Sequence, residues 1–128
     1  MRIEHIAIWS KDIERLKNFY IKHFNAVCNS KYTNDKKGFQ SYFLSFKNGA
    51  RIEIMQVPDL IESNDNNIRY VGLAHFAVSV GSKEAVDLIT NRIRYDGYTV
   101  LSEPRTTGDG YYESVVMDTD GNHLEITI

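Results

Sequence analysis

Short stretches in which hydrophobic and polar residues alternate recur along the chain, and this period of two is typical of β-strands with one buried face. The turns Asn48-Gly49 and Asp120-Gly121 each separate two such stretches. Asn-Gly and Asp-Gly pairs are the strongest short signals of a hairpin. The predicted strands are residues 2–9, 26–32, 39–46, 51–57, 75–80, 98–102, 111–117 and 123–128.

Two longer stretches place their hydrophobic residues three and four positions apart, which predicts amphipathic helices. The first begins after Asp12, a favourable N-cap, and ends at Asn25, which tolerates the left-handed conformation of a helix end. The second begins after Ser82 and ends at Asp96-Gly97. The residues expected to face the core are Ile13, Leu16, Phe19, Tyr20 and Phe24 in the first helix and Ala85, Val86, Ile89 and Ile93 in the second.

The order of strand, helix, strand and hairpin occurs twice, and the two copies share residues as well as pattern. His5-Ile6-Ala7-Ile8 matches His75-Phe76-Ala77-Val78, and Ile52-Glu53-Ile54 matches Leu124-Glu125-Ile126. The offset grows from 70 to 72 residues between these matches, which a two-residue insertion near the end of the second helix explains. Self-similarity of this kind indicates a duplicated structural unit.

The repeat predicts an α+β fold in which one domain contains two tandem β-α-β-β-β modules. The modules are expected to form a cupped mixed β-sheet with the helices on its outer face. The connection between them is expected to be a surface linker, because residues 63–67 are a polar run. Within the single domain, residues 1–128, the parts are module one, 1–56, the linker, 57–71, and module two, 72–128.

The faces of the strands separate apolar residues from a small polar set. Successive side chains of a strand point to opposite faces, so Ile6 and Ile8 share one face of the first strand and His5 lies on the other. The first and last strands of both modules repeat this division. The apolar face should cover the helix, and the other face carries His5, Glu53, His75 and Glu125. If the modules pack side by side, these four side chains converge.

Two imidazoles and two carboxylates form a nitrogen and oxygen donor set without thiolate. Such a set suits one divalent ion of Ni, Co, Zn, Fe or Mn, with water at the remaining positions. A strand histidine by itself is more often a hydrogen-bonded core residue, and a strand glutamate usually faces solvent. Their recurrence at equivalent positions of a repeat favours the metal site.

These modules and residues resemble the vicinal oxygen chelate superfamily, which includes glyoxalase I, extradiol dioxygenases and bleomycin resistance proteins. The segments Gly72-Leu73-Ala74-His75 and Thr107-Gly108-Asp109-Gly110-Tyr111-Tyr112-Glu113 are similar to a subgroup of small glyoxalase-like bacterial proteins. The resemblance covers essentially the whole chain. It implies a metal held by the first and last strands of each module, and therefore by His5, Glu53, His75 and Glu125.

A ligand set of two histidines and two glutamates resembles that of glyoxalase I. The resemblance implies a lyase or isomerase whose metal chelates two adjacent oxygens of a small-molecule substrate and stabilises an enediolate. Glu125, with Glu53 opposite, would move the proton between carbons. The thiol stays open, because Trp9 stands where bacterial glyoxalase I usually has an arginine that helps to hold glutathione. A homodimer is expected, since small members of the superfamily usually pair, with the site in one chain or across two.

One fold hosts many chemistries, and the resemblance leaves alternatives open. An extradiol-type ring-cleaving dioxygenase uses two histidines and one carboxylate. A metal-free drug-binding protein of the bleomycin resistance type binds its ligand in the same cleft without an ion. Fosfomycin-type thiol transfer and acyl-CoA epimerisation fit less well, because those enzymes lack or replace the carboxylate at the Glu53 position.

Composition excludes several other classes. The chain has 15 basic and 17 acidic side chains and a net charge of -2, so no general attraction to nucleic acid or to an anionic membrane is expected. No apolar run is long enough to span a bilayer. The single cysteine, Cys28, excludes an internal disulfide and a cysteine zinc site. With no signal-peptide pattern at the first residues, these features indicate a cytoplasmic protein.

The aromatic residues of the hairpins, Phe39, Tyr42, Tyr111 and Tyr112, are expected to pack across strands or against a second copy rather than to contact substrate. The loop at residues 105–110 is expected to be a plain glycine turn.

Overall fold

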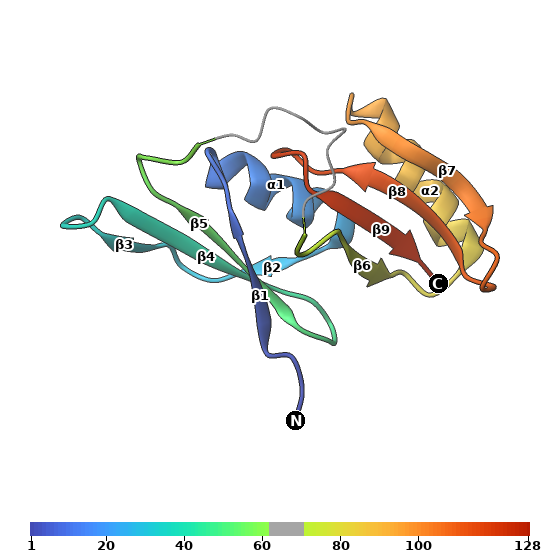
Figure 1. Cartoon of the computed structure of the whole chain (residues 1–128), viewed down its shortest axis with the longest axis horizontal. Helices are drawn as coiled ribbons and strands as arrows, with labels where there is room; N and C mark the ends of the chain where they lie inside the picture. The colour runs from blue at the N-terminus through green and yellow to red at the C-terminus, as the bar shows by residue number, and fades with distance from the viewer. Residues whose placement is uncertain (62–70) are drawn as a thin grey trace. The chain divides into compact units, whose positions relative to one another are not determined.

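The computed structural model describes residues 1–61 and 71–128 (Figure 1). Contacts between Cα atoms divide the chain into two compact units, which we call unit 1 (Met1–Ser63) and unit 2 (Asn64–Ile128). The polar run at 63–67, predicted to lie in a linker, falls outside the described residues. The elements are β1 (His5–Trp9), α1 (Ile13–Phe24), β2 (Val27–Cys28), β3 (Tyr32–Asn34), β4 (Phe39–Ser45), β5 (Arg51–Gln56), β6 (Phe76–Ser79), α2 (Lys83–Tyr95), β7 (Val100–Thr106), β8 (Tyr112–Met117) and β9 (His123–Thr127).

Both helices begin and end where their capping residues predict. Asp12 accepts a hydrogen bond from the backbone N–H of Arg15 at 3.0 Å, and Asn25 ends α1 in the left-handed conformation with φ 54°. Ser82 accepts a hydrogen bond from the N–H of Ala85 at 3.1 Å. Neither helix in the described part of the chain is long and apolar enough to cross a bilayer.

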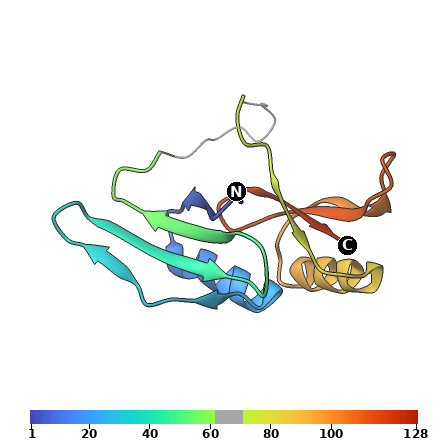
Figure 2. The ribbon, with the colours of Figure 1, turned by 90° about the horizontal axis from the view of Figure 1, so that it is seen from below.

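Each unit contains one mixed sheet and one helix, which confirms the α+β class and the two tandem modules. The sheet of unit 1 has the order β1-β5-β4-β2, with β3 also paired to β4, and that of unit 2 has the order β6-β9-β8-β7. β1 runs parallel to β5 and β6 runs parallel to β9, whereas the remaining pairs are antiparallel. Figure 2 shows α1 (blue) against one face of the unit 1 sheet and α2 (yellow) against one face of the unit 2 sheet.

The single strand predicted at residues 26–32 is two short strands instead. The side chain of Asn29 accepts a hydrogen bond from the N–H of Phe43 at 2.7 Å, so the ladder between β2 and β4 stops after Cys28. A turn then forms a hairpin from β3 to β4, and it contains Gly38 at φ 60°. A Cβ atom at Gly38 would lie 3.0 Å from Cγ of Pro58, so both the backbone angle and the limited space favour glycine at this position.

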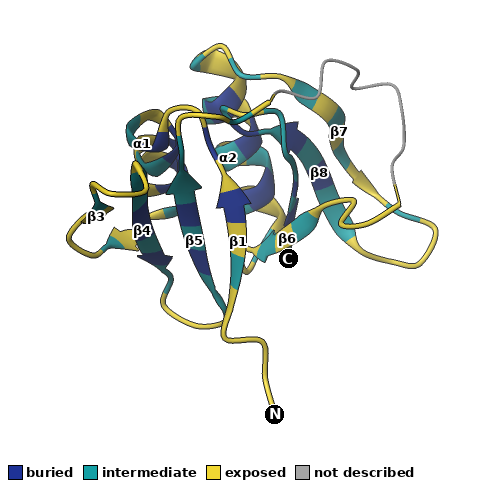
Figure 3. Ribbon diagram, turned by 60° about the vertical axis from the view of Figure 1, so that its left-hand side comes forward, coloured by how far each residue is buried: buried dark blue, intermediate teal, exposed yellow. Residues whose placement is uncertain are grey.

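The core of each unit lies between its helix and the apolar face of its sheet. Ile8, Ile52 and Ile54 are buried in unit 1, and Leu124 and Ile126 are buried in unit 2. Figure 3 shows the resulting alternation of buried and more exposed positions along β1 and β5. The strand side chains that alternate with these buried residues point away from the helix, so they can form a site on the other face of the sheet.

The packing of α2 on β8 includes two buried hydroxyl groups. Thr90 donates a hydrogen bond to the carbonyl oxygen of Val86 at 2.7 Å. Its hydroxyl oxygen also lies 2.6 Å from that of Ser114, and both residues are fully buried. Because Thr90 already donates to Val86, the Ser114 hydroxyl is the donor in the second bond. The pair satisfies both hydroxyl groups within the core.

A charged cluster centred on Glu14 connects α1 to β4. Oε1 of Glu14 accepts a hydrogen bond from the Tyr42 hydroxyl at 2.8 Å and lies 2.6 Å from Nζ of Lys31, while Oε2 pairs with Nζ of Lys17. The Lys17 ammonium lies 4.6 Å from the centroid of the Tyr42 ring. The hydrogen bond from Lys17, followed by those from Lys31 and Tyr42, lowers the pKa of Glu14 from 4.5 to about 2.

Candidate functional site

The first histidine and the first glutamate of the predicted set lie together in unit 1. The parallel register of β1 and β5 pairs Ala7 with Glu53, and His5 precedes Ala7 by two residues on the same face. Nε2 of His5 lies 3.8 Å from Oε2 of Glu53, and their side chains are 39% and 18% exposed. The residue beside Glu53 on β1 is thus the small side chain of Ala7.

The second pair lies in unit 2 with the same geometry. Ala77 on β6 pairs with Glu125 on β9, and His75 immediately precedes β6. Nε2 of His75 lies 3.2 Å from Oε2 of Glu125. The two His–Glu pairs are therefore equivalent in strand register, in the atoms that face each other and in the alanine beside them.

The donor chemistry of each pair fits a divalent ion. Two ligands bound about 2.1 Å from one ion are roughly 3.0–3.4 Å apart, depending on the coordination geometry. The 3.2 Å separation in unit 2 agrees with this value, and the 3.8 Å separation in unit 1 is slightly longer. Across residues 1–61 and 71–128, no group of three or more His, Cys, Asp or Glu side chains could hold an ion, so each unit by itself presents a pair of ligands.

His5 has a second carboxylate at its other ring nitrogen. Oε2 of Glu4 lies 2.5 Å from Nδ1 of His5, and Oε1 of Glu4 pairs with the guanidinium of Arg51. The hydrogen bond with His5 lowers the pKa of Glu4 most strongly, desolvation opposes it, and the hydrogen bond with Arg51 adds a smaller lowering. The Arg51 guanidinium also lies 4.2 Å from the centroid of the Phe43 ring, and His5 meets the same ring edge-on at 5.4 Å. Glu4 and Arg51 were not among the predicted site residues.

The second pair opens into a pocket of about 400 Å³ in unit 2. Three carboxylates line it, from Asp109, Glu113 and Glu125, and neither lysine nor arginine is among its lining residues. Arg105 faces Glu113 across the strands, but its guanidinium bonds the Ser102 hydroxyl. The complete lining is His75, Ala77, Asp109, Tyr111, Glu113, Glu125 and Thr127.

The pocket changes the interpretation of two predicted features. Of the loop predicted at 105–110, residues 105 and 106 belong to β7 instead, and the turn after them supplies Asp109 to the lining, so the segment is more than a plain glycine turn. Tyr111 also lines the pocket, and the hydroxyl groups of the other two tyrosines bond residues of the helices instead of packing across strands. The Tyr42 hydroxyl bonds Glu14, and the Tyr112 hydroxyl bonds Asp87 at 2.7 Å.

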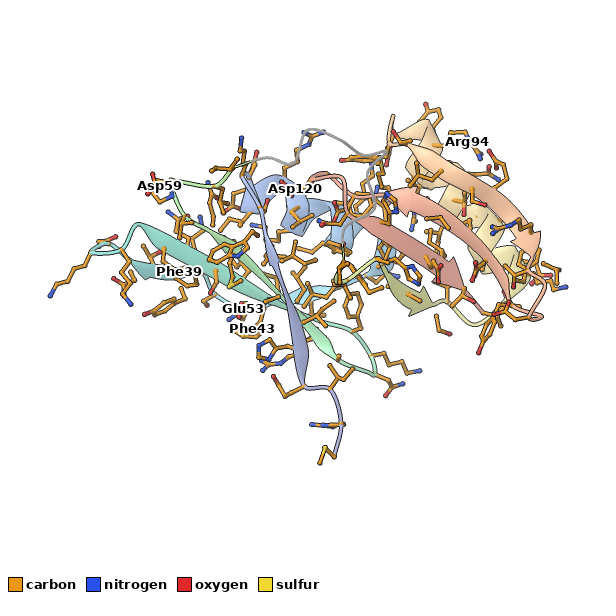
Figure 4. All side chains as sticks on the ribbon, in the orientation of Figure 1. Phe39, Phe43, Glu53, Asp59, Arg94 and Asp120 are labelled. Atoms are coloured by element: carbon orange, nitrogen blue, oxygen red, sulfur yellow. The ribbon has the colours of Figure 1, made fainter. Side chains whose placement is uncertain are left out.

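The equivalent face of unit 1 also carries aromatic side chains. Phe39 occupies the position that corresponds to Tyr111, and Trp9 meets its ring edge-on with centroids 6.3 Å apart. Trp9 is 50% exposed, although it is one of the largest apolar side chains in the protein. Figure 4 labels Phe39 and Phe43 on β4 and Glu53 on β5. The two His–Glu pairs are thus alike in register but differ in their neighbours. His5 contacts Phe43 and Glu4 in unit 1, whereas the pair in unit 2 opens into a pocket lined by Asp109, Glu113 and Tyr111.

Comparison with known families agrees with the fold and the repeat. A family model described as the Glyoxalase/Bleomycin resistance protein/Dioxygenase superfamily matches residues 2–126. The chain therefore belongs to this superfamily, and the resemblance inferred from its sequence is confirmed. No curated protein matches the chain.

Several solved structures share the fold at low sequence identity. Glyoxalase I from Zea mays aligns with a TM-score of 0.79 and 19% identity over 98% of this chain and 44% of its own. The trypanothione-dependent glyoxalase I of Leishmania major aligns with a TM-score of 0.78 and 18% identity over 99% of this chain and 86% of its own. A glyoxalase family protein from Enterococcus faecalis gives 0.80 and 21% over 99% and 97%. The chain spans less than half of the maize enzyme, and these likenesses establish the fold.

Proposed function

We propose that the protein is a metal-dependent, glyoxalase-I-like lyase or isomerase that acts on a small molecule with two adjacent oxygens. The observation that carries this proposal is the equivalence of the two His–Glu pairs. Each pair uses the same atoms in the same strand register, at 3.8 Å in unit 1 and 3.2 Å in unit 2. A set of four such ligands is the pattern that the sequence shares with glyoxalase I.

The proposed ligands of one divalent ion of Ni, Co, Zn, Fe or Mn are His5, Glu53, His75 and Glu125. They come either from one chain or from two copies in a homodimer, which we propose to be the cytoplasmic form of the protein. When bound, the ion supplies Lewis-acid polarisation of two adjacent substrate oxygens.

The role that we assign to Glu125 is proton transfer. Its carboxylate is 19% exposed and lines the pocket of unit 2, so it is shielded from bulk water yet accessible to a ligand. It would remove a proton from the carbon that bears the hydroxyl and return it to the neighbouring carbonyl carbon, with Glu53 on the opposite side. The first carbon is oxidised and the second is reduced, so the isomerisation needs no external oxidant or reductant.

Two alternatives within the superfamily lead to different measurements. An extradiol-type dioxygenase needs two histidines and one carboxylate, so it would depend on oxygen and tolerate replacement of one glutamate. A metal-free drug-binding protein would bind an aromatic compound beside Trp9 and Phe39 and would retain that binding after chelation. Glutamates at both equivalent positions favour the glyoxalase-like reaction over either alternative.

The test is metal analysis of the purified protein followed by an activity screen on hemithioacetals of several thiols. Cationic, neutral and anionic thiols should all be included, because the pocket contains three carboxylates. The expected result is one bound divalent ion per site and isomerisation of at least one adduct, lost on chelation and on replacement of Glu125 by Gln. A protein that binds the ion but converts no adduct of any thiol refutes the glyoxalase assignment, and oxygen-dependent cleavage of a catechol would then support the dioxygenase.

A further inference from the structure

We propose that Glu4 is a positioning residue that holds the His5 ring in one tautomer, with the proton on Nδ1 and the lone pair of Nε2 directed toward Glu53. The geometric basis is the 2.5 Å contact between Oε2 of Glu4 and Nδ1 of His5, together with the ion pair that fixes Glu4 to Arg51. The consequence for metal affinity, but not the tautomer itself, rests on the proposed function.

The tautomer follows from the hydrogen-bonding capacity of a carboxylate. An ionised carboxylate only accepts hydrogen bonds, so the Nδ1 atom of His5 must carry the proton that bonds Glu4. In the neutral ring Nε2 then has the lone pair. Nε2 lies 3.8 Å from Oε2 of Glu53, which is too long for a direct hydrogen bond. This separation is expected when neither atom carries a proton to donate to the other.

Arg51 keeps Glu4 in place from two directions. Its guanidinium pairs with Oε1 of Glu4, and its backbone N–H donates to the carbonyl oxygen of Glu4 at 3.0 Å. The guanidinium also lies 4.2 Å from the centroid of the Phe43 ring, whose edge contacts His5. An exposed ion pair contributes little to stability by itself. Together, however, these contacts limit the movement of the Glu4 side chain, which in turn orients the ring of His5.

The second histidine lacks this arrangement and serves as an internal control. The position equivalent to Glu4 is Ala74, and the position equivalent to Arg51 is His123. No described residue accepts a hydrogen bond from Nδ1 of His75, and the carboxylate nearest to its ring is Glu125, 3.2 Å from Nε2. The neutral His75 ring should therefore carry its proton on Nε2, opposite to His5.

A histidine ligand commonly gives its second ring nitrogen to a carboxylate, which fixes the tautomer that can bind an ion. Loss of such a partner typically lowers metal affinity by roughly 10-fold to 100-fold. Glu4 is 53% exposed on its side chain, so we expect the lower end, about 10-fold. The unsupported His75 must change tautomer before it binds, which makes His5 the better prepared of the two ligands.

The direct test measures tautomers in the metal-free protein. Long-range proton–nitrogen correlation spectra of protein with ¹⁵N-labelled histidine, recorded with a chelator at about pH 8.5, where an ordinary histidine is neutral, distinguish the two ring nitrogens. We expect the Nδ1–H form for His5 and the Nε2–H form for His75. Glu4→Ala should move His5 to the pattern of His75 without changing His75 itself. Identical tautomers in the wild type, or no change in Glu4→Ala, overturn the proposal.

The second measurement is calorimetric titration with Co²⁺ alone. Glu4→Ala should weaken binding about 10-fold, and Glu4→Gln, which keeps an acceptor oxygen, should retain most of the affinity. The matched control is Glu103→Ala, which removes an exposed carboxylate from an ion pair with Arg94 and leaves both histidines untouched. An equal loss in Glu103→Ala, or equal losses in Glu4→Ala and Glu4→Gln, contradicts a positioning role. A wild type that binds no Co²⁺ refutes the proposed function, while the tautomer spectra still decide the role of Glu4.

Discussion

Replacing Glu14 by Gln should destabilise the protein at neutral pH and have a clearly smaller effect in acid. The side chain accepts hydrogen bonds from Tyr42 and from two lysines, and these bonds favour its ionised form. Gln keeps the size of the side chain and one acceptor oxygen but cannot carry the charge. The variant therefore isolates the electrostatic part of the cluster that connects α1 to β4.

The pKa of Glu14 sets the magnitude and the pH window. Its lowering from 4.5 to about 2 corresponds to about 3.4 kcal/mol if every unit of pKa is converted at 1.36 kcal/mol. The side chain is 46% exposed, so solvent screening reduces this figure to roughly 1 kcal/mol. Because the folded pKa lies below the unfolded one, this stability is complete above pH 4.5 and is lost as the pH falls through 2.

Urea unfolding of the wild type and of Glu14→Gln, measured at pH 7 and pH 3, tests this reasoning. We expect a difference of roughly 1 kcal/mol in the free energy of unfolding at pH 7, equivalent to about 3–5 °C in Tm, and less than half of that difference at pH 3. Glu103→Gln, at a 70% exposed carboxylate paired with Arg94, is the control and should show a smaller change. A difference for Glu14→Gln that is the same at both pH values would refute the argument, because it could not arise from the charge.

Three further predictions concern the site and the core. Added Co²⁺ should raise the Tm of the wild type but not that of His5→Gln or His75→Gln. Both variants should keep the metal-free stability within about 0.5 kcal/mol, since these histidines lie off the helix-facing side of the sheet. A Tm increase that persists in either variant removes that histidine from the ligand set. Thr90→Val should lower the free energy of unfolding by roughly 1–3 kcal/mol in a thermal melt, because it leaves the Ser114 hydroxyl buried without its acceptor. Adding Ser114→Ala should recover part of this loss, and purely additive losses would show that the two hydroxyls do not interact. Glu113→Gln should favour an anionic thiol adduct over a neutral one by up to about fivefold in the ratio of their inhibition constants, because it removes one carboxylate from the pocket. An unchanged ratio would show that the pocket charge does not select the ligand.

The elements and both His–Glu pairs could be predicted because local rules decide them. Asp12 and Asn25 bound α1 through their own hydrogen bonds and backbone preference. Parity placed His5 and Glu53 on one face, because the period of two holds within a strand and the duplicated register repeats the placement. The second pair follows from the first by the repeat alone.

Features that depend on contacts outside regular strands could not be predicted in this way. Glu4 and His5 are adjacent, and adjacent residues of a strand point to opposite faces, so parity separates them. β1 begins only at His5, so this rule does not hold at Glu4, and Arg51 then fixes the carboxylate from another strand. The Glu14 cluster likewise joins α1 to β4, which no pattern within either element reveals.

Other features carried a signal that a fuller analysis of the sequence could have found. Glu113 has the same parity on β8 as Val115, which pairs with Glu125, so it belongs on the site face of the sheet. Its position is equivalent to Ser41, so the two modules differ at this point of the site face. The short strand β3 is preceded by Asn29, whose side chain competes with the backbone ladder, and such local competition is hard to weigh from sequence.

The parallel pairing of first and last strands has a consequence for how the protein folds during synthesis. Within the described residues of unit 1, β1 pairs with β5, so the sheet of unit 1 can close only after residues 51–56 have been synthesised. β6 depends on β9 in the same way, and β9 is an internal strand of its sheet. Such long-range closure gives each unit a high contact order and slows its folding. During synthesis, all strands of unit 1 are therefore available for pairing before β9 of unit 2 has been made. If synthesis stalled before β9, β6 would remain without its partner strand.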